Sequence, residues 1–89
     1  MNMDFVVIHN GKIYRCQEST LPKDRWGNSV IEDRRIELSH KLHSRSKHLQ
    51  TEILLHEALH IESPEWSENR VKNTARLLAR IIRKAKIDE

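Results

Sequence analysis

The pattern of hydrophobic and polar positions divides the chain into a first half of short β-prone segments and a second half with helical periodicity. In the first half, two β-prone segments at residues 5–8 and 13–16 flank the dipeptide Asn10-Gly11. Asn-Gly in that setting is the strongest short-range signal for a hairpin, because both central residues of the tight turn need positive φ. We therefore predict that the two segments pair as an antiparallel β-hairpin.

The segment that follows predicts a loop and then further strand. Residues 17–29 contain a proline and a glycine among polar residues and are predicted to form a loop. Residues 30–39 predict one short strand or two, because Ile36 and Leu38 alternate with charged residues and give one apolar face.

The periodicity changes to helical from Ser44 or Ser46 onward. Apolar residues then occupy most sides of the predicted helix, which is typical of a buried helix. Ser63-Pro64 ends this helix and suits the start of the next, and Ser67 is a second candidate for the N-cap of that next helix.

A final helix is predicted to run to about Lys86. Its apolar stripe, widened by Leu77 and Ile81, consists of Val71, Ala75, Leu78 and Ile82. Strands followed by two packed helices predict an α+β fold, and 89 residues suit a single domain spanning positions 1–89.

Composition narrows the cellular setting. A single cysteine, Cys16, excludes an intramolecular disulfide and a cysteine-rich metal site. The N-terminal segment has no basic leader of the signal-peptide type, and no apolar stretch reaches the roughly 20 residues that span a bilayer. These features predict a cytoplasmic protein with no membrane association.

Residues 56–60 are His-Glu-Ala-Leu-His, a spacing that suits a metal ion. On a helix, His56 and His60 lie about 6 Å apart on one face and can offer two imidazole nitrogens to one Zn²⁺. Glu57 projects about 100° away from His56 around the helix. In enzymes with the HExxH motif the glutamate at this position does not bind the metal but acts as general base on a water molecule. The alternative is that both histidines are ordinary structural or surface residues.

A catalytic zinc site takes three protein ligands, so one is needed beyond the two histidines. The downstream carboxylates are Glu62, Glu65 and Glu68. Glu62 lies on another side of the first helix, and Glu65 falls opposite the apolar stripe of the final helix. Glu68 lies at the edge of that stripe and is directed toward the first helix if the helices pack by their apolar faces. We predict Glu68 as the ligand; otherwise it is an acid that interacts favourably with the helix dipole.

The segment at residues 49–82, with GKIYRC and RRIELS before it, resembles the small HExxH metallopeptidases of phages and prophages, relatives of the ImmA/IrrE group and of the minigluzincins. The specific part is the run TEILLHEALH, followed by ENRV. The resemblance covers most of the chain and implies a minimal zincin-like domain that hydrolyses peptide bonds in a protein or peptide substrate. It also implies that His56, His60 and Glu68 bind zinc and that Glu57 is the general base.

The sequence does not decide which residue would stabilise the oxyanion or which strand would bind the substrate. A hydrogen-bond donor for the oxyanion could come from Tyr14, His40, His43 or Arg70. The strand at residues 34–39, as an edge strand before the HExxH helix, could bind an extended peptide by backbone pairing. Otherwise it is a sheet edge guarded by charged residues.

The final helix carries seven basic residues and no acidic residue between Asn69 and Ile87. Such a face could bind the phosphates of a nucleic acid, although a basic face of this kind is more often simply solvated and few aromatic residues are available for base stacking. The alternative function is therefore a non-catalytic zinc-containing module that binds nucleic acid or an acidic partner through this helix.

Overall fold

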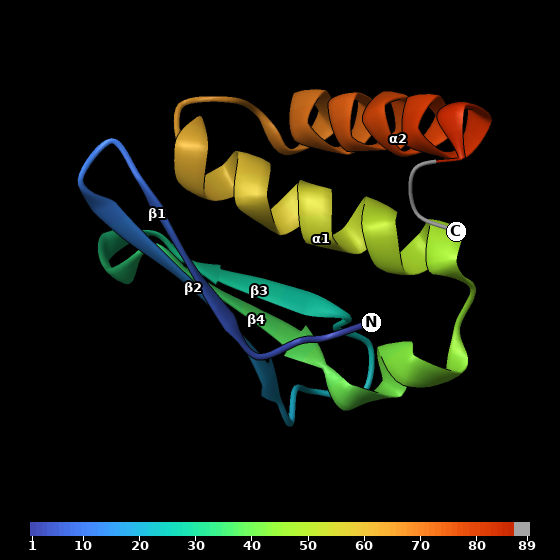
Figure 1. The fold of residues 1–89 in the computed structure, drawn as a ribbon, viewed down its shortest axis with the longest axis horizontal. Coiled ribbons are helices and arrows are strands. Elements are labelled where there is room, and N and C mark those ends of the chain that lie inside the picture. The colour runs from blue at the N-terminus through green and yellow to red at the C-terminus, as the bar shows by residue number, and fades with distance from the viewer. Residues whose placement is uncertain (87–89) are drawn as a thin grey trace.

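The computed structural model describes residues 1–86 and shows an α+β fold. A four-stranded sheet comes first and two packed helices follow, as predicted (Figure 1). The strand order across the sheet is β1-β2-β4-β3. The strands are β1 (Phe5–His9), β2 (Lys12–Ser19), β3 (Gly27–Val30) and β4 (Arg35–Ser39), the helices are α1 (Lys47–Glu62) and α2 (Glu68–Ala85), and short 3₁₀ segments lie at Ile31–Asp33 and His40–Ser44.

The predicted hairpin is confirmed. β1 pairs antiparallel with β2 in the register that places Phe5 opposite Cys16. The turn residues Asn10 and Gly11 have φ angles of 51° and 74°. Both angles lie in the left-handed region that the Asn-Gly signal requires.

The predicted loop at residues 17–29 is wrong at both of its ends. β2 continues to Ser19 and runs parallel to β4, while residues 27–30 form β3, which pairs antiparallel with β4. The sequence of β3 is Gly-Asn-Ser-Val, which has no apolar alternation and begins with two residues that strands usually lack. Its strand conformation therefore reflects pairing with β4 rather than local preference.

The strand that precedes α1 is not an edge strand, and that prediction is also wrong. A tight turn at Ile31–Asp33, followed by Arg34 at a φ of 48°, folds β3 back beside β4. β4 consequently lies between β2 and β3, and the two edges of the sheet are β1 and β3. Of the two edges, β3 is the one that packs against α1.

The sheet and the two helices form three layers with α1 in the middle (Figure 1). Residues 48–61 of α1 are all buried or half-buried, which confirms the prediction of a helix covered on most sides. Ser46 is its N-cap, with the hydroxyl oxygen accepting the N–H of Leu49 at 3.2 Å. Between α1 and the sheet lies the core cluster of Met3, Cys16, Ile36, Leu38, Leu42 and Ile61.

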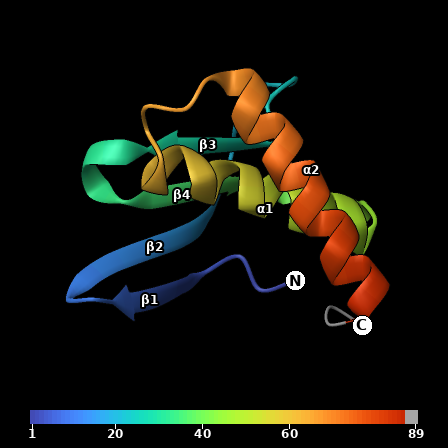
Figure 2. The ribbon, with the colours of Figure 1, turned by 90° about the horizontal axis from the view of Figure 1, so that it is seen from above.

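The apolar stripe of α2 is narrower than predicted. Val71 and Ala75 are buried, together with Ala79. Leu77 and Ile81 are 57% and 53% exposed, so they do not widen the buried face. The reason is that α2 packs on one side only, against α1, and the small alanines bring the two helices close. Figure 2 shows that α2 crosses α1 obliquely and begins on the side of the sheet where β3 lies.

Within residues 1–86, neither helix is long and apolar enough to cross a membrane.

Candidate metal and active site

A tight turn between the helices returns the chain to α1. The N–H of Trp66 donates to the carbonyl of Ser63 at 3.0 Å, with Pro64 at the second position of the turn, where its fixed φ is favoured. Ser67 is the N-cap of α2, and its hydroxyl oxygen accepts the N–H of Arg70 at 3.1 Å. Of the two predicted N-caps it is therefore Ser67, rather than Ser63, that begins the helix.

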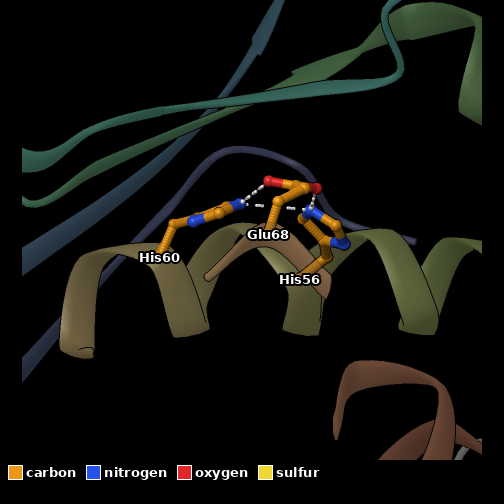
Figure 3. A group of neighbouring side chains, drawn as sticks. All are labelled: His56, His60 and Glu68. Atoms are coloured by element: carbon orange, nitrogen blue, oxygen red, sulfur yellow. Dashed lines mark hydrogen bonds and ion pairs between the residues drawn. The ribbon is translucent and has the colours of Figure 1, made fainter. Parts of the chain in front are cut away.

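This turn places Glu68, the first residue of α2, beside the two motif histidines (Figure 3). The Nε2 atom of His56 lies 2.8 Å from one carboxylate oxygen of Glu68, and Nε2 of His60 lies 2.8 Å from the other. The two Nε2 atoms are 3.2 Å apart. All three side chains thus direct a potential ligand atom at one point in space, and they form a His/Cys/Asp/Glu group suited to a metal ion within residues 1–86.

The spacing of these atoms fits a tetrahedral zinc ion. Nitrogen ligands at about 2.0–2.1 Å from a tetrahedral zinc lie roughly 3.3 Å from each other, close to the 3.2 Å between the Nε2 atoms of His56 and His60. The nitrogen–oxygen distances to Glu68 are those of charged hydrogen bonds and fall about 0.5 Å short of the same spacing. The Glu68 side chain is 68% exposed, so solvent surrounds the side from which it approaches.

Glu57 lies beside this group but is held by β3. Its side chain is buried against β3, where the hydroxyl of Ser29 lies 2.7 Å from Oε1 and 2.8 Å from the Glu57 carbonyl oxygen. One hydroxyl proton is shared between these two acceptors. Gly27 makes the close approach of β3 possible, since a Cβ there would lie 2.8 Å from Cγ of Glu57 and 2.9 Å from Oε2.

An open groove runs past the three converging side chains. Two adjoining hollows of about 420 and 470 Å³ share Gly27, Arg25, His56, Glu57 and Glu68 in their walls. The first hollow extends toward the end of β3 and the second toward the beginning of α1. The first hollow is also lined by Asn28, Ser29, Ile31 and His60. The second hollow is also lined by Asp24, Trp26, Glu52, Ile53 and Lys72.

The structure thus brings together His56, His60 and Glu68, and places Glu57 beside them. Their roles as ligands and as general base remain predictions. The other two candidate ligands lie elsewhere: Glu65 is exposed in the turn, and Glu62 accepts a hydrogen bond from the hydroxyl of Tyr14 at 2.9 Å.

The sequence candidates for an oxyanion donor do not line the groove in the described part of the chain. The hydrogen bond to Glu62 raises the pKa of the Tyr14 hydroxyl, which lies on β2, two strands away from β3. His43 pairs with Glu18 at 2.8 Å, and the guanidinium of Arg70 covers the ring of Trp66.

Sequence reasoning missed three residues of the groove. Ser29 donates a hydrogen bond that positions Glu57, and Gly27 leaves the space that the Glu57 side chain occupies. Arg25 lines both hollows, and its guanidinium donates to the Asn28 side chain at 2.9 Å. All three fall in or beside the segment predicted as a loop, and no motif marks them. A glycine next to a strand signals a close backbone approach, and that signal was available only for Gly27.

No protein-family model, no curated protein and no solved structure matches the chain.

Proposed function

We propose that the protein is a zinc-dependent peptidase of the small HExxH type, with His56, His60 and Glu68 as the metal ligands. The observation that carries the proposal is the convergence of three ligand atoms within 4.8 Å of one another, in an open groove that also contains a buried, oriented carboxylate. Two histidines and a glutamate are a ligand set that catalytic zinc uses, with one position left for water or substrate.

When bound, zinc would supply Lewis-acid polarisation of the scissile carbonyl and would lower the pKa of water toward about 7. Glu57 would act as the general base on the attacking water and then transfer that proton to the leaving amine. Its neighbourhood suits this role, because Ser29 fixes the orientation of the carboxylate and β3 shields it from bulk solvent. The hydrogen bond leaves Oε2 of Glu57 for the proton.

The groove favours an extended polypeptide as substrate. β3 is an edge strand, so its outer row of backbone N–H and C=O groups has no neighbouring strand among the described residues. An extended peptide can pair with such an edge, and pairing with β3 would carry it past the converging side chains of α1. The binding of an extended peptide by backbone pairing, which the sequence suggested for residues 34–39, is thus assigned to residues 27–30 in this proposal.

We also propose a reducing, cytoplasmic location. Cys16, the single cysteine of the sequence, is a buried thiol, and a lone thiol suits a compartment in which thiols are kept reduced.

The test begins with metal content. Protein purified without added metal should contain about one zinc per chain, and chelation should lower its melting temperature, because binding to the folded state is linked to stability. Glu57→Gln keeps the shape of the side chain but removes the base. The variant should retain zinc and lose hydrolysis of an unfolded protein substrate by at least about 10²-fold.

Glu65→Gln is the matched control, since it makes the same chemical change at an exposed residue of the turn. It should leave both zinc content and hydrolysis unchanged. Absence of zinc from the purified protein, with no shift in melting temperature on adding it, would refute the metal site. Equal hydrolysis by Glu57→Gln and the wild type would refute the role of Glu57.

A further inference from the structure

The basic residues of α2 include a row that faces solvent. Lys72, Arg76, Arg80 and Arg83 are all exposed and follow one another at spacings of four, four and three residues. Residues with these spacings are neighbours on one side of a helix. Among the described residues Lys72, Arg80 and Arg83 form no ion pair, and Arg76 reaches only Glu52, at 3.9 Å. We call these four residues the cation row.

The cation row begins at the candidate active site. Lys72 lies four residues after Glu68, so the two occupy successive turns on the same side of α2. Lys72 also lines the second hollow of the groove, together with His56, Glu57 and Glu68. Arg76 contacts Glu52 of α1, which lines the same hollow. A chain that leaves the groove at this end therefore meets the cation row.

The two four-residue intervals of the row, from Lys72 to Arg76 and from Arg76 to Arg80, match the repeat of an extended polypeptide. Side chains four residues apart on a helix are about 6 Å apart along its axis. Side chains two residues apart on one face of an extended chain are about 6.6–6.8 Å apart. The row from Lys72 to Arg83 covers roughly 16 Å, a length that about five extended residues span.

We infer that the groove and the cation row together bind an extended polypeptide that carries acidic side chains on one side of the bond placed at the His56–His60–Glu68 group. This inference rests on the proposed function for the position of that bond, but the binding of acidic residues by the row does not require hydrolysis. It assigns the substrate class: a polypeptide segment with aspartate or glutamate at alternate positions.

A polypeptide suits this surface better than a nucleic acid. Single-stranded nucleic acids are usually held by aromatic side chains as well as by cations, and the cation row contains no aromatic residue. The two tryptophans, Trp26 and Trp66, are each covered by an arginine guanidinium, at 4.9 Å and 4.0 Å from the ring centres. The adjoining groove also presents the acids Asp24, Glu52 and Glu57, which would repel the uniformly charged backbone of a nucleic acid but not a polypeptide whose acidic residues lie only on the side of the cation row.

The experiment measures binding to the zinc-loaded Glu57→Gln protein, so that the probe stays intact. One fluorescent peptide of about twelve residues has an uncharged half and a half that alternates glutamate with alanine, and a second has glutamine in place of every glutamate. A labelled single-stranded DNA of similar length is the third probe. The test variant combines Lys72→Glu, Arg80→Glu and Arg83→Glu. The matched control combines Lys12→Glu, Arg15→Glu and Lys41→Glu, exposed cations outside α2 with the same total change in charge.

The glutamate peptide should bind at least about tenfold more tightly than the glutamine peptide, and higher salt should reduce the difference. The test variant should lose this preference and the control should keep it. Equal binding of the two peptides, or equal loss in the control, would overturn the inference. Tighter binding of the DNA, displacing the acidic peptide, would overturn it in favour of a nucleic-acid partner. If the acidic peptide binds as expected while the wild type hydrolyses no protein, the proposed function fails and the cation row stands.

Discussion

Gly27→Ala is the smallest change that should separate the role of the proposed general base from that of the proposed metal ligands. Gly27 begins β3 where this strand crosses α1, and a Cβ at this position would lie 2.8 Å from Cγ of Glu57, 2.9 Å from its Oε2 and 3.1 Å from Cγ2 of Ile53. Real Cβ contacts are longer than the first two distances, so either Glu57 or β3 must move. Either movement disturbs the 2.7 Å hydrogen bond between Ser29 and Glu57.

The magnitude follows from these contacts. An extra methyl group in a packed region costs about 1–3 kcal/mol, and for a chain of this size each kcal/mol lowers the melting temperature by about 4–8 °C. A melting temperature lower by roughly 5–20 °C is therefore expected. Displacement of a catalytic group by about 1 Å reduces the rate about 10²-fold. Zinc affinity should change little, because the nearest atoms to the new methyl group belong to Glu57 and Ile53 rather than to a proposed ligand.

Thermal unfolding, zinc titration and hydrolysis of an unfolded protein are the three measurements. Gly11→Ala is the control: it has no atom within 4 Å of the added Cβ but a φ of 74°. It should cost about 1 kcal/mol through backbone strain and leave hydrolysis and zinc affinity unchanged. If Gly27→Ala melts and hydrolyses like the wild type, the close contact between β3 and Glu57 does not position the base, and the reasoning is refuted.

Two further predictions concern Glu68 and Cys16. Glu68→Ala should weaken zinc binding at least about 10²-fold because it removes one of the three proposed ligands, while Glu65→Ala should bind zinc as the wild type does in isothermal titration; equal weakening by both would contradict the assignment. Burial raises the pKa of the Cys16 thiol to about 11, so the native protein should react with iodoacetamide at neutral pH much more slowly than the unfolded protein, and equal rates would contradict this. Because the folded-state pKa exceeds the ordinary value, the thiol's contribution to stability is complete below about pH 9 and is lost as the pH rises toward 11. Cys16→Ala should remove this part of the pH dependence in denaturant titrations.

The features that sequence reasoning predicted well are those whose structure depends on near neighbours. The Asn10-Gly11 hairpin is specified by the conformations of two adjacent residues. The helix starts at Ser46 and Ser67, each one of two candidates in the sequence, depend on hydrogen bonds to residues three positions later. The distance between the Nε2 atoms of His56 and His60 follows from one turn of helix.

The features that sequence reasoning missed depend on partners far away in the chain. β3 is a strand because β4 pairs with it, and its Gly-Asn-Ser-Val sequence carries little strand preference of its own. The parallel pairing of β2 with β4 likewise follows from packing of the whole sheet. Ser29 lies 28 residues before Glu57, so its role becomes visible only once β3 is placed against α1.

The turn between the helices explains why a short interval is sufficient for the third candidate ligand. Seven residues separate His60 from Glu68, and a flexible connection of that length would leave the carboxylate free to take many positions. Here α1 ends at Glu62, the hydrogen-bonded turn from Ser63 to Trp66 reverses the chain, and Ser67 starts α2 at once. Glu68 thus lies at the first position of a rigid helix, where little conformational entropy remains to be lost when a metal binds. The Ser67 cap that stabilises the start of α2 therefore also preorganises the candidate metal site.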